Sequence, residues 1–171
     1  MSRFKQAFAI VVGEEGGLST DPVDPGNWTG GIRGRGQCLG TKYGISAAAH
    51  PDVDIAGLSL VDAQALYAQQ YWQPVRGDEL PPQLALVVFD TAVNCGTSKA
   101  VRWLQAAVGC QQDGVLGSLT LAAAQAPDRT ISTCAHILAS RLISMTTLPT
   151  WQHFGLGWTH RICALPYQAI S

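Results

Sequence analysis

Two acidic residues near the start of the chain have the type and spacing needed for acid–base chemistry. Phe4, Phe8 and Val11 follow one another at helical spacing and share one apolar face. Glu15 continues this series, so its carboxyl is predicted at the end of an apolar helical face. Loss of hydration in such a place raises the pKa of a glutamic acid and keeps it protonated near neutral pH. The expected role is a general acid that protonates a leaving group.

A second carboxylate, Asp24, lies on the loop from Asp21 to Gly26, which must turn back past the end of this helix. If ionised, it can orient a water molecule or stabilise positive charge on a sugar ring. Asp21 competes for this role, although Asp-Pro pairs are common in turns and either aspartate can simply cap its own loop. For Asp21 the turn role is favoured. Glu15 itself has the alternative of a solvated helix end beside Glu14.

The elements that would position these acids are a first helix and a long irregular segment. The helix is predicted from Ser2 to Glu14 or Glu15, where a pair of glycines stops it. From Ser19 to Thr41 no helical period is present, and Asp, Pro, Gly, Asn and Thr dominate. This composition predicts a long loop or a small glycine-rich β-hairpin. Loops of this length in compact domains are usually functional.

The remainder of the chain is predicted to be helical. Ser59 and Asp62 resemble a capping box at the start of one helix, and Pro74 ends it. The apolar run from Leu84 is compatible with a buried strand, but small and apolar residues continue to Gly96, which favours a helix. Further helices are expected at 97–108, from Ser118 to Pro127 and at 128–146, followed by an aromatic-rich segment at 151–167. The predicted fold class is mainly α.

Composition excludes several classes of protein. The chain has 171 residues, 47% of them apolar, which suffices for one compact core. Only 13% are charged and the net charge is -1, so no basic field for binding nucleic acid is expected. Membrane insertion is not expected, because no apolar run approaches the length of a spanning helix. The N-terminus lacks a signal-like apolar core, which predicts a soluble monomer made in the cytoplasm without a signal peptide.

No metal or cofactor is expected. The five cysteines form no C-x-x-C pair, and free, packed thiols are predicted. The four histidines have no metal-binding spacing. The glycine-rich segment 34–42 fits neither a Walker A loop nor a dinucleotide-binding motif. Arg33, Arg35 and Lys42 form a local basic patch around this segment. The patch is expected to be either a solvated loop or a contact for an anionic polymer.

The block from Glu15 to Gly26, E-G-G-L-S-T-D-P-V-D-P-G, followed by T-K-Y-G-I-S at 41–46, resembles the signature of the glycoside hydrolase 108 family of lysozyme-like N-acetylmuramidases. Weaker similarities continue through Tyr71-Trp72, the segment 89–96 and Asp113-Gly114 to Gly157-Trp158. The resemblance implies a lysozyme-like helical fold with a small glycine-rich loop or β-hairpin after the first helix. It further implies a catalytic region at 1–96 and a C-terminal helical region at 97–171 resembling a peptidoglycan-binding module, packed as one compact unit.

The resemblance implies cleavage of the β-1,4 bond between N-acetylmuramic acid and N-acetylglucosamine in peptidoglycan. Glu15 falls at the position of the general acid and Asp24 at that of a second carboxylate. Thr41 falls on a threonine of the hairpin that can hold a water molecule. The segment 27–40 is longer than the corresponding link in the family. Thr29 is therefore an alternative to Thr41 as the residue that matches the family's threonine. Whether the anomeric configuration is inverted or retained stays open.

Substrate contacts are expected from Asp21, Tyr43 and Asn94, and from Arg33 of the basic patch. A lytic transglycosylase and a non-catalytic peptidoglycan-binding module are alternatives. The biological setting is expected to be a phage endolysin released by a holin, or an antibacterial type VI secretion effector with a cognate immunity protein that plugs the cleft. In either case the site of action would be the periplasm or cell wall.

Overall fold

The computed structural model describes residues 1–14, 16–126, 128–168 and 170, so Glu15 lies outside the described residues. The described chain is mainly α-helical, as predicted, with one small antiparallel sheet. None of its helices is long and apolar enough to cross a membrane. The α-helices are α1 (Arg3–Val11), α2 (Leu60–Tyr67), α3 (Pro82–Cys95), α4 (Thr97–Val108), α5 (Ser118–Ala124), α6 (Thr130–Thr146) and α7 (Trp151–Ala164), and the strands are β1 (Thr41–Lys42) and β2 (Ile45–Ser46).

The chain forms two compact units. The first combines Met1–Ala7 with Ala68–Ser171, and the second is Phe8–Tyr67. The boundaries fall within α1 and at the end of α2, where a π-helical turn, Ala68–Trp72, follows directly. The predicted catalytic and C-terminal regions, 1–96 and 97–171, are divided at a different place and stay a prediction.

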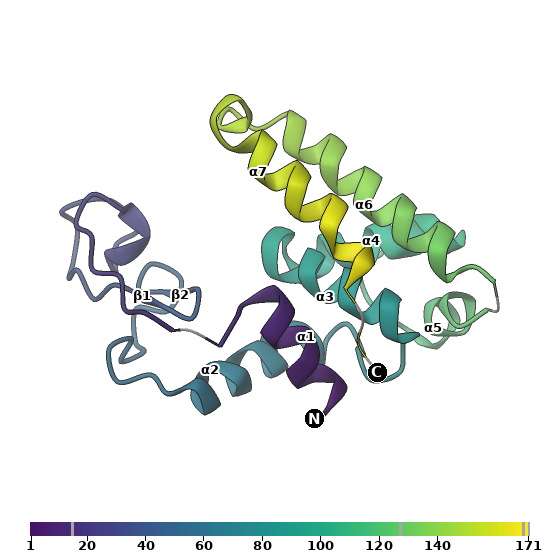
Figure 1. Ribbon diagram of the computed structural model, residues 1–171, viewed down its shortest axis with the longest axis horizontal. Helices are drawn as coiled ribbons and strands as arrows, with labels where there is room; N and C mark the ends of the chain where they lie inside the picture. The colour runs from purple at the N-terminus through teal and green to yellow at the C-terminus, as the bar shows by residue number, and fades with distance from the viewer. Residues whose placement is uncertain (15, 127, 169, 171) are drawn as a thin grey trace. The chain divides into compact units, whose positions relative to one another are not determined.

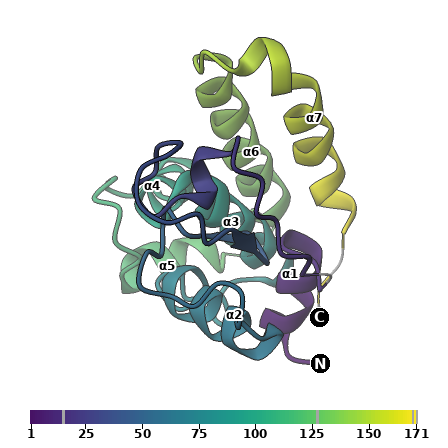
Figure 2. The ribbon, with the colours of Figure 1, turned by 90° about the vertical axis from the view of Figure 1, so that its left-hand side faces the viewer.

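The core of the first unit forms around α3. Its side chains from Leu84 to Ala92 are all buried, because this helix is apolar nearly all round. α3, α4 and α6 each pack against the other two, and α7 packs against α6. Figures 1 and 2 show α6 and α7 running side by side in opposite directions. The helical alternative for the run at Leu84 was therefore correct.

The N-terminal residues belong to this first unit through specific contacts. Nη1 of Arg3 donates to the backbone oxygens of Asp78 and Leu80, at 2.9 and 3.1 Å. The ring of Phe4 lies 5.7 Å from Trp72 and 6.0 Å from Phe89, centroid to centroid. Aromatic pairs in this range add stabilisation beyond the burial of their surface.

The second unit has a smaller core of buried side chains: Phe8, Val11, Ile45, Ala47, Ile55, Leu58, Ala63 and Tyr67. The rings of Phe8 and Tyr67 meet edge to face at 5.3 Å. The predicted capping box opens α2, because the Ser59 hydroxyl donates to Asp62 Oδ2 at 2.5 Å and accepts from the Asp62 N–H at 3.2 Å. These bonds from Ser59 lower the pKa of the Asp62 carboxyl.

Several helix boundaries differ from the predictions. α1 ends at Val11, earlier than predicted, because Gly13 adopts φ +85° and its N–H closes the helix onto Phe8 O at 3.2 Å. α6 begins at Thr130, two residues later than predicted, because Asp128 adopts φ 64°. The five cysteines are free thiols in the structure, but only Cys134 is buried and Cys163 is exposed, so the expected packing holds for Cys134 alone.

Candidate active site

A two-residue β-hairpin is the scaffold of the candidate site in the second unit. Thr41 pairs with Ser46 and Lys42 with Ile45. The turn between them places Tyr43 at φ 50° and Gly44 at φ 72°, the left-handed pair that tight hairpins require. A Cβ at position 44 would come within 2.7 Å of the Tyr67 hydroxyl, so only glycine fits there.

Tyr43 is held in a conformation that side chains rarely adopt, and its ring lies against the backbone of Gly16. A Cβ on Gly16 would lie 2.0 Å from Cε1 of that ring. The Tyr67 hydroxyl donates to the backbone oxygen of Tyr43 at 3.1 Å. A non-glycine residue at positive φ costs free energy and is common at functional sites. The structure thus brings the predicted substrate contact Tyr43 onto the residue that follows Glu15 in sequence.

Thr41 is tied to a fully buried side chain, that of Asn27. The Thr41 hydroxyl donates to Asn27 Oδ1 at 2.7 Å, and Asn27 Nδ2 donates to the backbone oxygen of Asp21 at 2.9 Å. Thr41 also exchanges two backbone hydrogen bonds with Ser19, at 2.8 and 2.9 Å. Because the hydroxyl proton is used on Asn27, its lone pairs are left to accept a hydrogen bond, for example from water.

The insertion at 28–39 is closed at its base, where Leu39 and Gly40 donate their N–H groups to the backbone oxygen of Asn27 at 2.9 and 3.1 Å. We call Asn27 and Gly40 the neck of the insertion. Above it, Trp28 and Cys38 form a β-bridge. Gly40, at φ +91°, packs so closely that an added Cβ would lie 2.5 Å from Ser19 O. Thr29 lies within the insertion and Thr41 on the hairpin, so the two competing threonines occupy different elements.

Asp24 and Asp21 both shape the loop, as the turn alternative predicted. Asp24 caps the short 3-10 helix Pro25–Asn27, where its Oδ1 accepts the Gly26 N–H at 2.8 Å. Asp21 Oδ1 accepts the Val23 N–H at 2.9 Å. Asp24 is exposed, and its Oδ2 makes no hydrogen bond to any described residue. A structural role for one oxygen therefore leaves the other available for chemistry.

Arg33 lies within the insertion and takes no part in the hydrogen bonds described above. It is exposed, within a turn that closes where the Arg35 N–H donates to Ile32 O at 3.0 Å. The hydrogen bonds of the hairpin involve Ser19, Asn27 and Thr41 and do not extend to Arg33.

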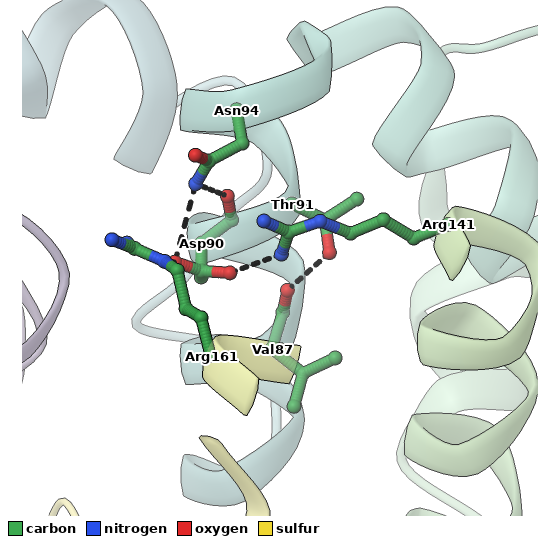
Figure 3. Close-up of polar contacts among 6 residues, drawn as sticks. All are labelled: Val87, Asp90, Thr91, Asn94, Arg141 and Arg161. Atoms are coloured by element: carbon green, nitrogen blue, oxygen red, sulfur yellow. Dashed lines mark hydrogen bonds and ion pairs between the residues drawn. The ribbon is translucent and has the colours of Figure 1, made fainter. Parts of the chain in front are cut away.

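Asn94 belongs to the other unit, where its exposed side chain joins a polar cluster around the buried Asp90 (Figure 3). Its Nδ2 donates to the backbone oxygen of Asp90 at 2.8 Å and to Asp90 Oδ1 at 3.2 Å. Asp90 pairs through Oδ2 with Nη1 of Arg141 on α6, and through Oδ1 with Nη2 of Arg161 on α7 at 2.6 Å. Asp90 and Arg141 are almost fully buried, whereas the Arg161 side chain is 43% exposed. One carboxylate thus joins three helices.

Two polar residues that organise these regions carried no assigned role in the sequence. Asn27 appeared to be one more turn former, and its burial depends on Thr41, which is distant in sequence. Asp90 offered a signal, since it is an acid inside the apolar run of α3 and must have a buried partner. Its partners Arg141 and Arg161 are too far along the chain to be identified by spacing.

Among the residues that the structure describes, no group of three or more His, Cys, Asp or Glu side chains is arranged to hold a metal ion. The candidate groups are instead carboxylates, a hydroxyl and an aromatic ring. Glu15, the predicted general acid, lies outside the described residues. Such groups suit proton transfer and the orientation of water around a sugar.

Comparison with known proteins places this arrangement in a family. The family model described as Glycosyl hydrolase 108 matches residues 8–96. Among solved structures, the chain is similar to the structure of Brucella abortus SagA, with 32% sequence identity and a TM-score of 0.74. That match covers 96% of this chain and 91% of the SagA chain. The curated proteins include no match.

Proposed function

The chain belongs to the glycosyl hydrolase 108 family, and from this premise we propose that it is a peptidoglycan hydrolase of the N-acetylmuramidase type. The bond cleaved would be the β-1,4 bond between N-acetylmuramic acid and N-acetylglucosamine. The observation that carries the proposal is family membership combined with the acid at position 15, which follows an apolar helix and precedes a glycine-rich hairpin. Peptidoglycan strands are the proposed partner.

In the proposed mechanism Glu15 donates its proton to the glycosidic oxygen as the bond from that oxygen to the anomeric carbon breaks. The sugar ring then carries oxocarbenium character, which a nearby carboxylate stabilises. A water molecule adds to the anomeric carbon and must lose a proton. Asp24, whose Oδ2 makes no hydrogen bond to the described residues, suits either stabilisation of the ring or removal of that proton, and the two roles predict different stereochemistry.

The hairpin residues have supporting roles in this proposal. The Thr41 hydroxyl donates to Asn27, so it can accept a hydrogen bond from the attacking water and orient it. Tyr43 offers a ring for a sugar face. Asp21 and Arg33 are proposed to contact substrate at the edge of the site, and Asn94 is proposed as a further substrate contact.

The central experiment compares Glu15→Gln with Glu14→Gln, its exposed neighbour, in clearing of purified cell walls. Loss of a general acid lowers the rate by about 10²–10⁴-fold, so Glu15→Gln should be nearly inactive and Glu14→Gln active. Lysis by Glu15→Gln at the wild-type rate would refute the proposed role.

A second pair of variants separates chemistry from turn formation at Asp24. Asparagine retains the oxygen that accepts the Gly26 N–H but removes the charge. Asp24→Asn should therefore keep the unfolding midpoint and lose wall-clearing rate. The matched control is Asp52→Asn, at an exposed aspartate outside the loop 21–26, and it should keep both. Equal activity of Asp24→Asn and the wild type would restrict Asp24 to its capping role.

Product analysis distinguishes hydrolysis from the two alternatives. A hydrolase leaves a reducing sugar end, whereas a lytic transglycosylase forms a 1,6-anhydro end that is lighter by one water molecule. Mass spectrometry of digests before and after borohydride reduction distinguishes these ends. A binding module would sediment with cell walls and release no product.

We further propose that the protein acts on the cell wall in the periplasm or beyond, either as an endolysin after holin release or as an antibacterial effector. An effector requires a cognate immunity protein that blocks the site. A neighbouring gene for a small exported protein, and co-purification of its product with this chain, would favour the effector. A neighbouring holin gene would favour the endolysin.

A further inference from the structure

One face of α7 carries a row of three aromatic rings that the proposed reaction does not use. Trp151, Phe154 and Trp158 follow one another at spacings of three and four residues, so they lie on one face. The Trp151 and Trp158 rings are 6.2 Å apart, and those of Phe154 and Trp158 are 5.9 Å apart. We call these three residues the aromatic row. Phe154 is 56% exposed, which is unusual for a ring of this size.

The row is fixed by the helix beneath it. The Trp151 ring lies over Gly155, where an added Cβ would meet ring atoms at 2.7 and 2.8 Å. Glycine within a helix costs about 1 kcal/mol relative to alanine. The close approach of the Trp151 ring explains why glycine occupies position 155 despite this cost.

The solvent side of the row is open and polar. Helical spacing places Gly157 next to the row, and a Cβ added at Gly157 would have open space around it. His153 and His160 follow on the same side. Glycine and polar residues therefore border the row on this side. A helix that inserts into a membrane surface needs a broad apolar face instead.

The charge around the row suits an anionic polymer. Residues 129–171 contain no Asp or Glu, but they include Arg129, Arg141 and Arg161. Arg141 is buried against Asp90, whereas the side chain of Arg161 is 43% exposed. The row leads along α7 to Arg161, whose guanidinium is held by Asp90, and Asp90 also holds Asn94. Asp90 offsets only one of the two guanidinium charges of Arg141 and Arg161, so this end of the row carries net positive charge.

We propose that the aromatic row is a glycan-binding surface that holds the sugar rings of a peptidoglycan strand. The C–H groups on the face of a pyranose ring are weakly positive and pack against the negative face of an aromatic ring. The carboxylates of the stem peptides meet no acidic side chain of segment 129–171. The identity of the glycan rests on the proposed function, whereas binding at the row requires no bond cleavage.

The test measures binding of the full chain to purified, insoluble sacculi by co-sedimentation on ice. Phe154→Leu keeps an apolar side chain but loses the ring, and it should weaken binding about fivefold to tenfold. Trp158→Leu should act in the same direction. Phe154→Tyr, which keeps the ring, should bind within about twofold of the wild type. Tyr167→Leu is the matched control, because this aromatic residue is 89% exposed and lies outside the row.

Several results would overturn the proposal. The first is binding of Phe154→Leu to sacculi as tightly as the wild type, and the second is a loss of binding in Tyr167→Leu as large as that in Phe154→Leu. The third such result is a wild-type protein that is dimeric in solution and becomes monomeric in Phe154→Leu. Binding of the wild type, but not Phe154→Leu, to phosphatidylglycerol–phosphatidylethanolamine vesicles would assign the row to membranes instead. Far-UV circular dichroism verifies that each variant is folded.

Failure of this inference and failure of the proposed function are distinguishable. If Glu15→Gln stops lysis and Phe154→Leu still binds normally, the glycan surface is refuted and the reaction stands. If Glu15→Gln remains lytic while Phe154→Leu binds weakly, the general acid is refuted and the surface stands.

Discussion

Replacement of Asp90 by asparagine should destabilise the protein more than any other single change in the polar cluster. Arg141 is buried to 1% exposure and is neutralised by Asp90. Asparagine keeps the shape of the side chain but removes the charge, so a guanidinium remains buried without a counter-charge. Breaking a buried pair in this way costs about 3–5 kcal/mol. This is a large part of a total stability of about 5–15 kcal/mol.

The opposite change, Arg141→Met, should cost less. Asp90 would keep its 2.6 Å contact with Arg161 and its hydrogen bond from Asn94, so its charge stays neutralised. We expect a loss of about 1–3 kcal/mol from the missing bond to Asp90. The double variant Asp90→Asn/Arg141→Met should be more stable than Asp90→Asn alone, because the stranded guanidinium is gone.

Urea unfolding followed by both far-UV circular dichroism and tryptophan fluorescence measures these differences. Coincidence of the two probes tests whether one transition describes both compact units. Arg76→Gln is the control, since its ion pair with Glu79 is exposed (34% and 48%) and its loss should leave the midpoint unchanged. The reasoning is refuted if Arg141→Met costs as much as Asp90→Asn, or if the double variant loses the sum of both.

Three further predictions concern other sites. Thr41→Val leaves buried Asn27 Oδ1 without its donor and should lower the free energy of unfolding by about 1–3 kcal/mol, as measured in urea against the exposed change Thr20→Val. Gly16→Ala places a Cβ 2.0 Å from the Tyr43 ring and should reduce wall clearing about tenfold or more, whereas Gly17→Ala, with open space at its Cβ, should not. Burial raises the pKa of Cys134 from 9.0 to about 11, so stability present below pH 9 should fall as the pH rises toward 11. Urea midpoints at pH 8 and 10.5, compared with those of Cys134→Val, measure this loss, and constancy of the difference would contradict it.

The helices were predictable from sequence because their signals are local. The capping box at Ser59 and the glycine at position 109 mark ends that the structure reproduces. The end of α1 was missed because Gly13 outweighs the apolar period that continues toward Glu15. Ile32, a large apolar residue of the insertion, is 56% exposed, since the insertion has little core of its own.

The candidate site was predictable only in part, because its geometry depends on contacts distant in sequence. Residue types indicated Asp24, Thr41 and Tyr43, and the hairpin was expected from its composition. The link from Thr41 through Asn27 to Asp21 joins positions on both sides of the insertion, and no local pattern encodes it. The contact of Tyr43 with Gly16 is of the same kind.

Because the neck closes the base of the insertion, the position of the hairpin does not depend on the length of residues 28–39. The two neck residues, Asn27 and Gly40, are hydrogen-bonded to each other, so their positions in the unit stay the same whatever segment lies between them. Each doubling of a flexible loop adds only about 0.6 kcal/mol of closure entropy. An affinity tag or fluorophore could therefore be spliced into the tip near Arg33, giving a reporter that leaves Thr41 in place.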